Sequence, residues 1–544
     1  METNSLIRLA IGTCFASLAA TAATGASPTT PAPATTVRLA PATLPPIAKV
    51  DLRYQSYNVE MAEVVGGNFW KPYTAESIAA MKAKAAAGAT ATGVAGQDPT
   101  MFQARAPIDL SNPRLRKLAA ALGPAYMRTS GTWANTVYFH DADGPAPAKV
   151  PEGFQGVLNR SQWKNVIDFA QAANASLVTS FAIGAGVRDR NGVWTPGQAR
   201  KFVAYTRAAG GHIAAAEFFN EPDMPVYGGA PKGYSARDYA RDFAVFRAFA
   251  HKDAPDMRIV GPGSVGEGVL MPRMGGGGLA AGLVKTADML AATPAPKVDI
   301  FSYHFYGAAS IRCASMGAGA QTTAADALSE AWLARTDTSY DFYVKGLRDR
   351  YEPGKPVWIT ETADAACGGN PWAATFLDSF RYLDQLGRLA RRGVSVVFHN
   401  TLASSEYGLL DESTFAPRPN YWAALLWHRL MGTTVLDAGP SRPGLHLYAQ
   451  CLPGHAGGVT VLAINNSRTQ PASIELPLPA RRYTLGAAKL EDGQVQLNGH
   501  VLALAAGDAL PPLAGVAEAA GRATLAPATL TFFAMAGAAN PACH

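Results

Sequence analysis

The sequence has few charged residues, few cysteines and no long apolar run after its first segment. Charged residues make up 16 % of its 544 residues, and the net charge is only +6. Because no run of like charges concentrates that excess, we expect no nucleic-acid partner. Five cysteines without a C-x-x-C pair exclude a disulfide-dense miniprotein and give no sign of zinc or redox chemistry. Beyond the first segment no stretch reaches the ~18 apolar residues that span a bilayer, so we expect no membrane span.

The first 26 residues are typical of a cleaved secretory signal peptide. Residues 6–23 are mostly apolar and small, and small residues continue to Ala26 before a stretch rich in Ser, Pro and Thr. The alternative is an amphipathic first helix. It is disfavoured because residues 27–46, rich in Pro, Thr and Ala, could not pack such a helix onto a core. We therefore expect a mature protein that is secreted or periplasmic.

Removal of this signal would also remove Cys14 and leave four cysteines. These are Cys313, Cys367, Cys451 and Cys543. An even number of cysteines in an oxidising compartment fits two disulfide bridges. Four cysteines allow three pairings, and their spacing does not choose among them.

Apolar residues are plentiful, since they make up 48 % of the chain, and this excludes disorder as its main state. Eight short β-rich runs recur in the middle of the chain, with helical or loop segments between them. The runs are residues 57–61, 126–131, 177–183, 215–219, 258–260, 299–306, 357–362 and 394–401. Alternation of strands and helices indicates a parallel sheet, and eight units predict a (β/α)8 TIM barrel over residues 53–430.

The sequence changes character after the last of these runs. Short apolar runs follow at residues 445–449, 459–465, 472–478, 495–497, 501–505 and 526–533. Asp492-Gly493 and Asn498-Gly499 favour tight hairpins between them. This pattern predicts an all-β sandwich over residues 431–544. Residues 27–52 are expected to form a Pro/Thr-rich linker that adds edge strands to the sandwich.

Two glutamates follow two of the predicted barrel strands. Asn220-Glu221-Pro222 comes after strand four, and Glu361 ends strand seven. Side chains at the carboxyl ends of barrel strands meet at one mouth, where barrel enzymes keep their sites. A retaining glycosidase needs two carboxyl groups roughly 5–5.5 Å apart, one as acid and one as nucleophile. Each glutamate alone is better explained as a strand-end residue; the pair together predicts glycosidase catalysis.

Neighbouring residues fit this interpretation. Pro222 is expected to hold Glu221 in extended backbone, and Asn220 can hydrogen-bond a substrate hydroxyl. His304 and Tyr306 alternate along one strand and point the same way, so Tyr306 can donate to Glu361. The alternative is that His304 is a structural histidine with its hydrogen bonds satisfied and that Tyr306 belongs to the core. No ligand spacing typical of zinc accompanies the histidines, and no P-loop or nucleophile elbow occurs, so we expect neither metal nor cofactor.

These residues belong to an ordered set that resembles glycoside hydrolase family 79, the heparanase and β-glucuronidase family. The matching stretches cover nearly all of the mature chain. They are residues 115–118 and 123–128, Ser130-Gly131-Thr132, Asn220-Glu221-Pro222, Gly261-Pro262, residues 303–306, Thr360-Glu361-Thr362, Cys367-Gly368-Gly369, and residues 407–421, 447–451, 495–499 and 510–512.

The resemblance implies a role for particular side chains. Glu221 would be the acid/base, Glu361 the nucleophile and Tyr306 the hydrogen-bond partner of the nucleophile. Asn220 and Thr132 would contact the sugar. Tyr407 and the backbone around Gly368 would hold a uronate carboxylate, as donors of hydrogen bonds can.

The family's C-terminal bridge would correspond to Cys451 and Cys543. Cys313 and Cys367 remain, and pairing the remainder makes them the second bridge.

Some positions depart from the family. Glu60 stands where the family often has Asp, and Glu267 and Asn400 stand where heparanases carry glutamines. We expect these three residues and His304 to contact substrate. The basic clusters that would grip sulfated heparan chains are missing.

We therefore expect a secreted retaining β-glucuronidase whose partner is a glucuronide-containing oligosaccharide, polysaccharide or glycoconjugate. The alternatives are a related glycosidase for a neutral sugar and a non-catalytic carbohydrate-binding protein.

Overall fold

The computed structural model describes residues 36–86, 99–273 and 282–544. The predicted signal peptide lies outside these residues. No helix in the described part of the chain combines the length and the apolar character that crossing a bilayer requires.

Eight parallel strands close into a barrel, which confirms the predicted fold. Around the barrel the order is β10-β11-β12-β13-β14-β3-β6-β9, so each strand neighbours the next in sequence. The strands are β3 (Gln55–Asn58), β6 (Ala125–Thr129), β9 (Ala175–Thr179), β10 (Ile213–Glu217), β11 (Arg258–Val265), β12 (Ile300–Ala309), β13 (Val357–Ala366) and β14 (Val396–His399). Apolar side chains such as Val178, Val260 and Trp358 fill one end of the barrel.

Three strands run further than their sequences indicate. β11 continues five residues past the predicted end at residue 260, to Val265, and β12 and β13 continue to Ala309 and Ala366. The pairing of β12 with β13 extends from Phe301↔Val357 to Ala309↔Ala366. Glu361 therefore lies inside β13 rather than at its end, and the ladder beyond it forms a wall above the barrel mouth.

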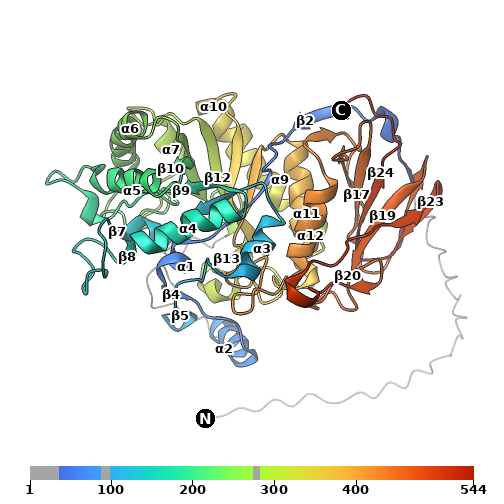
Figure 1. Cartoon of the computed structure of the whole chain (residues 1–544), viewed down its shortest axis with the longest axis horizontal. Helices are drawn as coiled ribbons and strands as arrows, with labels where there is room; N and C mark the ends of the chain where they lie inside the picture. The colour runs from blue at the N-terminus through green and yellow to red at the C-terminus, as the bar shows by residue number, and fades with distance from the viewer. Residues whose placement is uncertain (1–35, 87–98, 274–281) are drawn as a thin grey trace, which may run out of the picture. The chain divides into compact units, whose positions relative to one another are not determined.

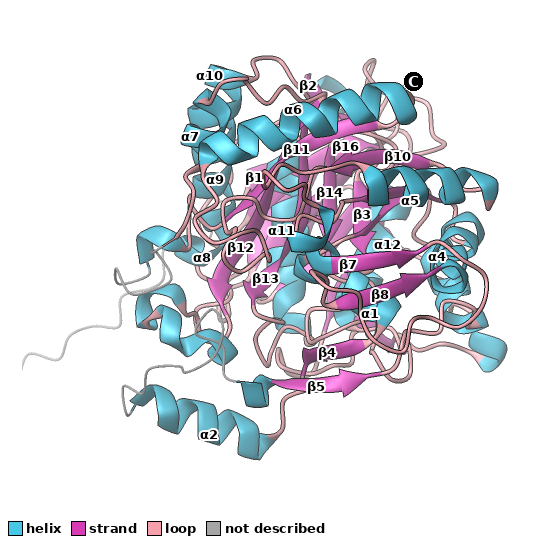
Figure 2. Cartoon of the chain, turned by 90° about the vertical axis from the view of Figure 1, so that its left-hand side faces the viewer, coloured by secondary structure: helices cyan, strands magenta, loops and turns pink. Residues whose placement is uncertain are grey.

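Helices surround the barrel strands, as Figure 2 shows for α5 and α6. Three of them begin with a capping box, which satisfies free N–H groups of the first turn: Glu60 with Glu63 in α1, Asn159 with Gln162 in α4 and Ser235 with Asp238 in α6. The helices are α1 (Met61–Val65), α2 (Ala75–Ala86), α3 (Pro113–Ala120), α4 (Arg160–Ala172), α5 (Gly197–Ala208), α6 (Ala236–Asp253), α7 (Thr286–Ala291), α8 (Glu330–Leu333), α9 (Arg335–Tyr340), α10 (Asp349–Tyr351), α11 (Phe376–Arg391) and α12 (Pro419–Leu430).

Two small sheets extend the loops after the first two barrel strands. β4 (Gly67–Trp70) pairs antiparallel with β5 (Phe102–Arg105), and β7 (Val137–His140) pairs in parallel with β8 (Gly156–Asn159). The β4–β5 pair brings aromatic side chains to the mouth of the barrel.

Two sheets form the C-terminal all-β region. One has the order β1-β18-β23, and the other runs β2-β15-β16-β17-β24-β19-β20-β21 with β22 beside β19. The strands are β1 (Val37–Arg38), β2 (Pro46–Lys49), β15 (Thr434–Leu436), β16 (His446–Cys451), β17 (Val459–Asn465), β18 (Ala472–Leu476), β19 (Ala480–Gly486), β20 (Gln496–Leu497), β21 (His500–Val501), β22 (Val516–Glu518), β23 (Gly521–Leu525) and β24 (Thr529–Met535). A core of its own, including Val461, Ile474 and Phe533, lies between the sheets.

Two strands from before the barrel belong to these sheets. β1 pairs with β18, and β2 pairs with β15. Figure 1 shows β2 near the C-terminus. The side chain of Asn540 donates hydrogen bonds to the carbonyls of Pro41 and Leu44. The two ends of the described chain are thus joined in one region.

A buried polar network connects this region to helix α11. His446 of β16 contacts Asp384 Oδ1 at 2.5 Å through Nδ1 and Glu330 Oε2 at 2.9 Å through Nε2. Tyr448 also donates to Asp384, and Arg388 pairs with the other oxygen of the same carboxylate at 2.6 Å. The network attaches the sandwich to the barrel through two carboxylates, Asp384 and Glu330.

The structure contains both expected disulfides. Cys313 is bonded to Cys367, and Cys451 is bonded to Cys543. The first bridge ties the loop after β12 to the loop after β13. The second ties β16 to the last residues of the chain.

Candidate active site

A cavity of about 230 Å³ opens at the mouth of the barrel. It lies over the carboxyl ends of the strands. Its wall includes Glu60, Trp70, Thr132, Trp133, Glu221, Met224, Tyr227, Val265, Leu270, Met271, Leu283, Tyr306, Met316, Glu361, Cys367, Asn400 and Tyr407.

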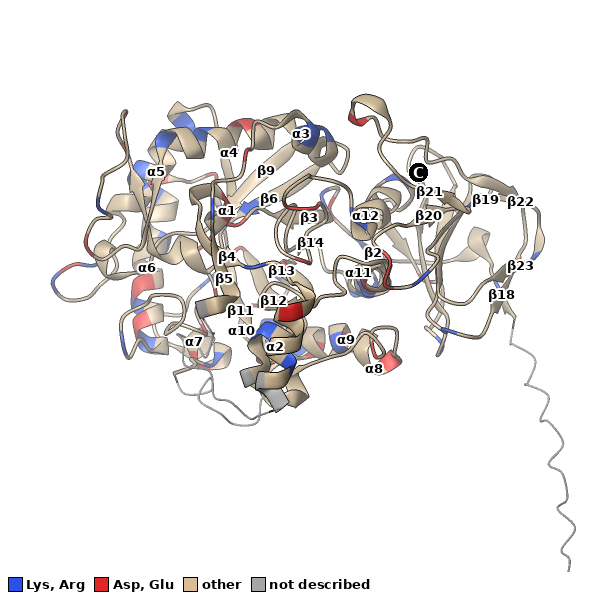
Figure 3. Ribbon diagram, turned by 90° about the horizontal axis from the view of Figure 1, so that it is seen from below, with Lys and Arg blue, Asp and Glu red and all other residues tan. Residues whose placement is uncertain are grey.

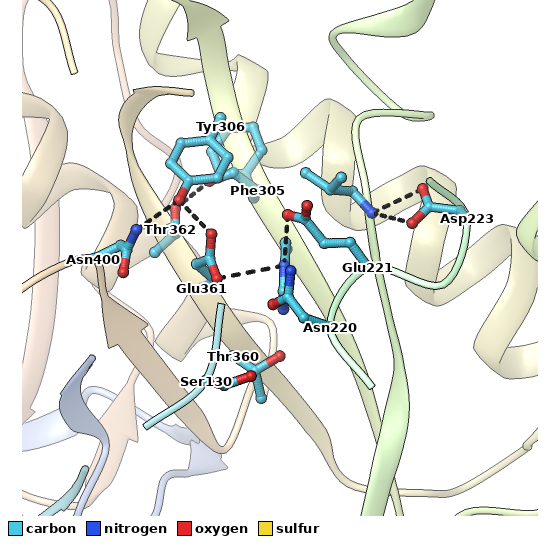
Figure 4. Close-up of polar contacts among 12 residues, drawn as sticks. Ser130, Asn220, Glu221, Asp223, Phe305, Tyr306, Thr360, Glu361, Thr362 and Asn400 are labelled. Carbon is cyan, nitrogen blue, oxygen red and sulfur yellow. Dashed lines mark hydrogen bonds and ion pairs between the residues drawn. The ribbon is translucent and has the colours of Figure 1, made fainter. Parts of the chain in front are cut away.

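Glu361 is held from two sides at the base of this cavity. Tyr306 of β12 donates a hydrogen bond of 2.6 Å to Glu361 Oε1. Arg128 of β6 donates one of 2.9 Å to Glu361 Oε2. In Figure 4, Tyr306 lies above Glu361, and a dashed line marks the hydrogen bond between them. Both donors fix the orientation of this carboxylate.

Glu221 lies in the loop after β10 with its backbone in the left-handed region, at φ +50°. The expectation that Pro222 would keep it extended is therefore wrong. The reason is tertiary: Asn135 bonds both the N–H and the C=O of Asn220, and the N–H of Met224 bonds the carbonyl of Glu221. These contacts outweigh the local preference, and such strained conformations cluster at functional sites.

The carboxyl group of Glu221 faces a histidine. His304 Nδ1 lies 3.0 Å from Glu221 Oε1. Burial and the nearby charge of Glu361 raise the pKa of Glu221, while the hydrogen bond with His304 acts in the opposite direction. Burial alone would lower the pKa of His304, but the carboxylates of Glu361, Glu217 and Glu221 raise it to about 10. The site therefore has a protonated histidine beside a carboxyl group that holds its proton more tightly than usual.

Glu221 and Glu361 approach each other closely. One carboxylate oxygen of each, together with a ring nitrogen of His304, lies within 4.8 Å of the others. Inverting glycosidases hold their two carboxyl groups ~6.5–9.5 Å apart to admit a water molecule, whereas retaining enzymes hold them ~5–5.5 Å apart. The spacing here fits direct attack by one carboxylate on a bound sugar.

Such a group of ligand-type atoms also invites comparison with a metal site. Arg128 disfavours that use, because its guanidinium lies within 2.9 Å of Glu361 and 3.4 Å of His304. A histidine whose pKa is raised to about 10 is protonated on both nitrogens at neutral pH and offers no lone pair. The arrangement suits proton transfer and nucleophilic attack.

The sequence analysis missed a buried ion pair beneath the site. Arg128 donates to Glu217 Oε2 at 2.8 Å, and both side chains are fully buried. Burial would raise the pKa of Glu217, but Arg128 and His304 lower it to about 2. The sequence does contain a signal for this pair: β6 and β10 each carry one charged residue and are otherwise uncharged. Because charged side chains are almost never buried without a partner, the two could have been expected to pair.

Asn220 and Thr132 are placed differently from each other. Asn220 Oδ1 accepts a hydrogen bond of 2.7 Å from Arg128, so this amide oxygen is already engaged. Thr132 begins a short 3-10 helix and lies in the cavity wall.

Three further expected residues meet around one amide. Asn400 Nδ2 lies 2.9 Å from Glu60 Oε1, 3.0 Å from the phenol oxygen of Tyr306 and 3.3 Å from that of Tyr407. Asn400 thereby connects Tyr306, which donates to Glu361, with Glu60 and Tyr407 in the cavity wall. Burial and the charge of Glu361 raise the pKa of Glu60 well above its usual value.

A turn with two glycines follows Cys367 of the first disulfide at the edge of the cavity. Cys367, Gly368 and Gly369 all have positive φ, at 65°, 79° and 81°. A Cβ on Gly368 would come within 2.7 Å of both Trp70 and Arg312, so the turn requires glycine there. Arg312, which the sequence analysis missed, donates to the carbonyls of Cys367 and Gly369. Cys367 lies in the cavity wall, whereas Gly368 lies behind it.

Glu267 is not brought to the cavity. Its carboxylate accepts from the N–H of Thr286 at 3.0 Å, next to the start of α7. Gly266 and Leu270 on either side of it line the cavity, so the loop reaches the mouth while the carboxylate of Glu267 is bonded to Thr286 instead. His304 and Asn220 likewise act on Glu221 and Arg128 from below the cavity wall.

The fold is shared with glycosidases of known structure. The chain is similar to a 4-O-alpha-L-rhamnosyl-beta-D-glucuronidase from Fusarium oxysporum 12S, with a TM-score of 0.58 and 14 % identity over 92 % of this chain and 100 % of that one. It is similar to the GH51 arabinofuranosidase from Xanthomonas axonopodis pv. citri, with a TM-score of 0.57 and 15 % identity over 90 % and 97 %. At these identities the likeness concerns the fold alone.

Sequence relatives point to one family. The chain is 27 % identical over 495 residues to the heparanase of Mus musculus, covering 80 % of this chain and 88 % of that protein. It is 28 % identical over 390 residues to heparanase-like protein 1 of Arabidopsis thaliana, covering 68 % and 67 %. The model of the N-terminal domain of glycosyl hydrolase family 79 matches residues 102–387, more than half of the chain. The chain therefore belongs to glycosyl hydrolase family 79, and it is a glycoside hydrolase.

Proposed function

We propose that this enzyme is a retaining glycosidase that cleaves β-D-glucuronides. The observation that carries the proposal is that one carboxylate oxygen of Glu221 lies within 4.8 Å of one carboxylate oxygen of Glu361 at the cavity. That spacing supports double displacement through a covalent glycosyl-enzyme.

Glu221 serves as the acid and then as the base. Its raised pKa favours the protonated form, which can give a proton to the leaving oxygen. Glu361 attacks the anomeric carbon, and the aglycone departs with the proton of Glu221. Glu221, now ionised, takes a proton from water as that water attacks the glycosyl-enzyme and releases Glu361. Protonated His304 stabilises ionised Glu221 between the two steps.

The uronate carboxylate is held on the side of Glu60, Asn400 and Tyr407. Tyr407 and Asn400 supply a phenol and an amide there. The raised pKa of Glu60 favours its protonated form, which can donate to a carboxylate where the ionised form would repel it. The relatives support a uronate: besides heparanases they include the hyaluronoglucuronidase of Hirudo nipponia, 25 % identical, and the baicalin-beta-D-glucuronidase of Scutellaria baicalensis, 29 % identical over 40 % of this chain.

The charges do not favour a sulfated polymer. Among the described residues that line the cavity, none is a lysine or an arginine. In the view of Figure 3, basic residues are scattered over several helices, including α2, α5 and α9. An unsulfated glucuronide therefore fits the site better than heparan sulfate.

We also infer that the enzyme is exported. Two disulfides form where the surroundings are oxidising, as outside the cell or in the periplasm. The signal peptide expected for residues 1–26 agrees with that location.

The test is release of nitrophenol from matched substrates by the full chain. We expect turnover of the β-glucuronide far above that of the β-glucoside and the α-arabinofuranoside. A preference for either neutral sugar would show that the proposed substrate is wrong but would leave the two-glutamate mechanism unaffected. Binding without turnover of any of the three would indicate a carbohydrate-binding protein.

A further inference from the structure

The wall of the cavity differs in chemistry from one side of the barrel to the other. The polar groups Glu60, Glu361, Asn400 and Tyr407 come from the neighbouring strands β3, β13 and β14 and the loops after them. The side chains that end or follow β10 and β11 are, apart from Glu221 itself, apolar or aromatic. They are Met224, Tyr227, Val265, Leu270, Met271 and Leu283.

Two tryptophans line the cavity away from the apolar side, in the loops after β3 and β6. Trp70 stacks on Phe102 with ring centroids 4.7 Å apart. Trp133 meets Phe69 edge to face at 5.2 Å. Trp70 and Trp133 both line the cavity. Each indole is thus fixed by a second ring while remaining at the cavity wall.

Several of these apolar side chains are only half-buried. Met224, Tyr227, Met271, Leu283 and Trp133 all retain exposed surface at the cavity. Exposed apolar surface gathered in one concave place is typical of a ligand site. Unbranched methionines adapt to ligands of differing shape and make favourable contacts with aromatic rings.

The position of Glu221 decides which part of a substrate meets this surface. Glu221 lies in the same loop as Met224 and Tyr227. The acid of a retaining glycosidase protonates the oxygen that joins the sugar to its aglycone. The aglycone must therefore lie on the side of the cavity that carries Glu221, which is the apolar side.

We propose that the preferred substrates are β-glucuronides of a flat apolar aglycone, such as an aromatic alcohol, bound against the loops after β10 and β11. This inference rests on the proposed function, since it needs the glucuronyl group on the polar side. A sugar aglycone would leave its hydroxyls facing methionine, leucine and valine, without the partners that buried polar groups require.

The test uses S-linked glucuronides, which a glycosidase cleaves too slowly for leaving-group strength to matter. Naphthyl thioglucuronide and a thio-linked glucuronyl-glucosamine compete with nitrophenyl glucuronide for the full chain, and the inhibition constants are compared. We expect the naphthyl compound to bind at least about tenfold more tightly, as a pocket matched to apolar surface does. Equal affinities, or tighter binding of the disaccharide, would overturn the proposal.

Two variants locate the preference. Met224→Ala should reduce the affinity for the naphthyl compound severalfold and leave that for the disaccharide unchanged. Val226→Ala is the matched control, because Val226 lies in the same loop with 53 % of its surface exposed and outside the cavity wall. Equal effects of the two substitutions would place the aglycone elsewhere and contradict the proposal.

The outcomes separate this inference from the proposed function. Turnover of glucuronides without an aromatic preference would remove only the aglycone assignment. Absence of glucuronide turnover, with a neutral sugar cleaved instead, would remove both.

Discussion

Arg128 Nη1 lies 2.9 Å from Glu361 Oε2, with the arginine fully buried and the glutamate nearly so. The same guanidinium pairs with Glu217, so one cation serves two carboxylates. A buried arginine shared in this way fixes both carboxylates in place, and it lowers the pKa of Glu217. The nucleophile proposed here therefore depends on a side chain from β6, across the barrel from its own strand.

Arg128→Met should destabilise the fold by about 3–5 kcal/mol, because the buried Glu217 would lose the arginine that pairs with it at 2.8 Å. Combining it with Glu217→Gln should restore part of that loss, since the unpaired charge is then removed. Urea denaturation of the two single variants and the double variant measures the coupling. Additive losses would show that the pair does not act as a unit.

Glu361→Ala should abolish glycosyl-enzyme formation, because no carboxylate remains to attack. Glu221→Ala should still form the intermediate from substrates with good leaving groups, since these need no proton in the first step. Addition of azide distinguishes the roles: we expect a β-glycosyl azide from the Glu221 variant and an α-glycosyl azide from the Glu361 variant. The reverse products would exchange the two assignments.

Tyr407→Phe should raise KM mainly for the nitrophenyl glucuronide and leave the matching glucoside nearly unaffected. The phenol lost is the one beside Asn400 at the polar rim. A pocket built to bind a polar group rejects an analogue that lacks it strongly, because its own polar groups are left unpaired. Equal changes in kcat/KM for both substrates would contradict the uronate assignment.

His446 should make the fold less stable at alkaline pH. Burial lowers its pKa, but Asp384 and Glu330 outweigh burial and raise it to about 9, with Arg388 also facing the ring. The folded-state pKa therefore lies above the ordinary ~6.5. The stabilisation is complete below about pH 6.5 and is lost as pH rises through about 9, by on the order of 3 kcal/mol.

The check is thermal denaturation of the parent protein and of His446→Gln between pH 6 and pH 10. Glu63 and Asp364, whose pKa values burial raises to about 8 and 7, titrate in both proteins and cancel in the difference. The difference in Tm between the parent protein and His446→Gln should decrease as the pH rises. A constant gap would show that His446 does not titrate in this range.

Loss of the second disulfide should weaken the fold. Cys451 and Cys543 are 92 residues apart in sequence, so opening the bridge releases a long loop in the unfolded chain. Replacing both by serine should lower the free energy of unfolding by about 2–5 kcal/mol. Chemical denaturation measures the loss, and an unchanged midpoint would contradict it.

The barrel and the two glutamates were predictable because their signals are local. Each strand is a short β-rich run, and each glutamate follows such a run. Contacts that join distant strands were not predictable in the same way. Arg128 and Glu217 look like two unrelated strand residues until the barrel closes. Glu267 was misplaced because its carboxylate is bonded to Thr286, 19 residues further along the chain.

Four sandwich strands, β15, β19, β22 and β23, lie outside the predicted runs, and two of them show a different reason. In β23 the buried positions are Ala523 and Leu525, with Arg522 and Thr524 exposed between them. Alanine is too small to mark a strand by its hydrophobicity. β19 carries two adjacent arginines, Arg481 and Arg482. Both strands are identified by their pairing partners, β18 and β24.

The pairing of β2 with β15 has a consequence for biosynthesis. β2 ends at Lys49, and its partner begins at Thr434, so the ribosome must make the whole barrel between them. At ~5–20 residues per second this takes roughly 20–80 s. Throughout that time the first strands of the sandwich have no partner strand. The catalytic barrel can therefore begin to fold before the region that holds both chain ends can close.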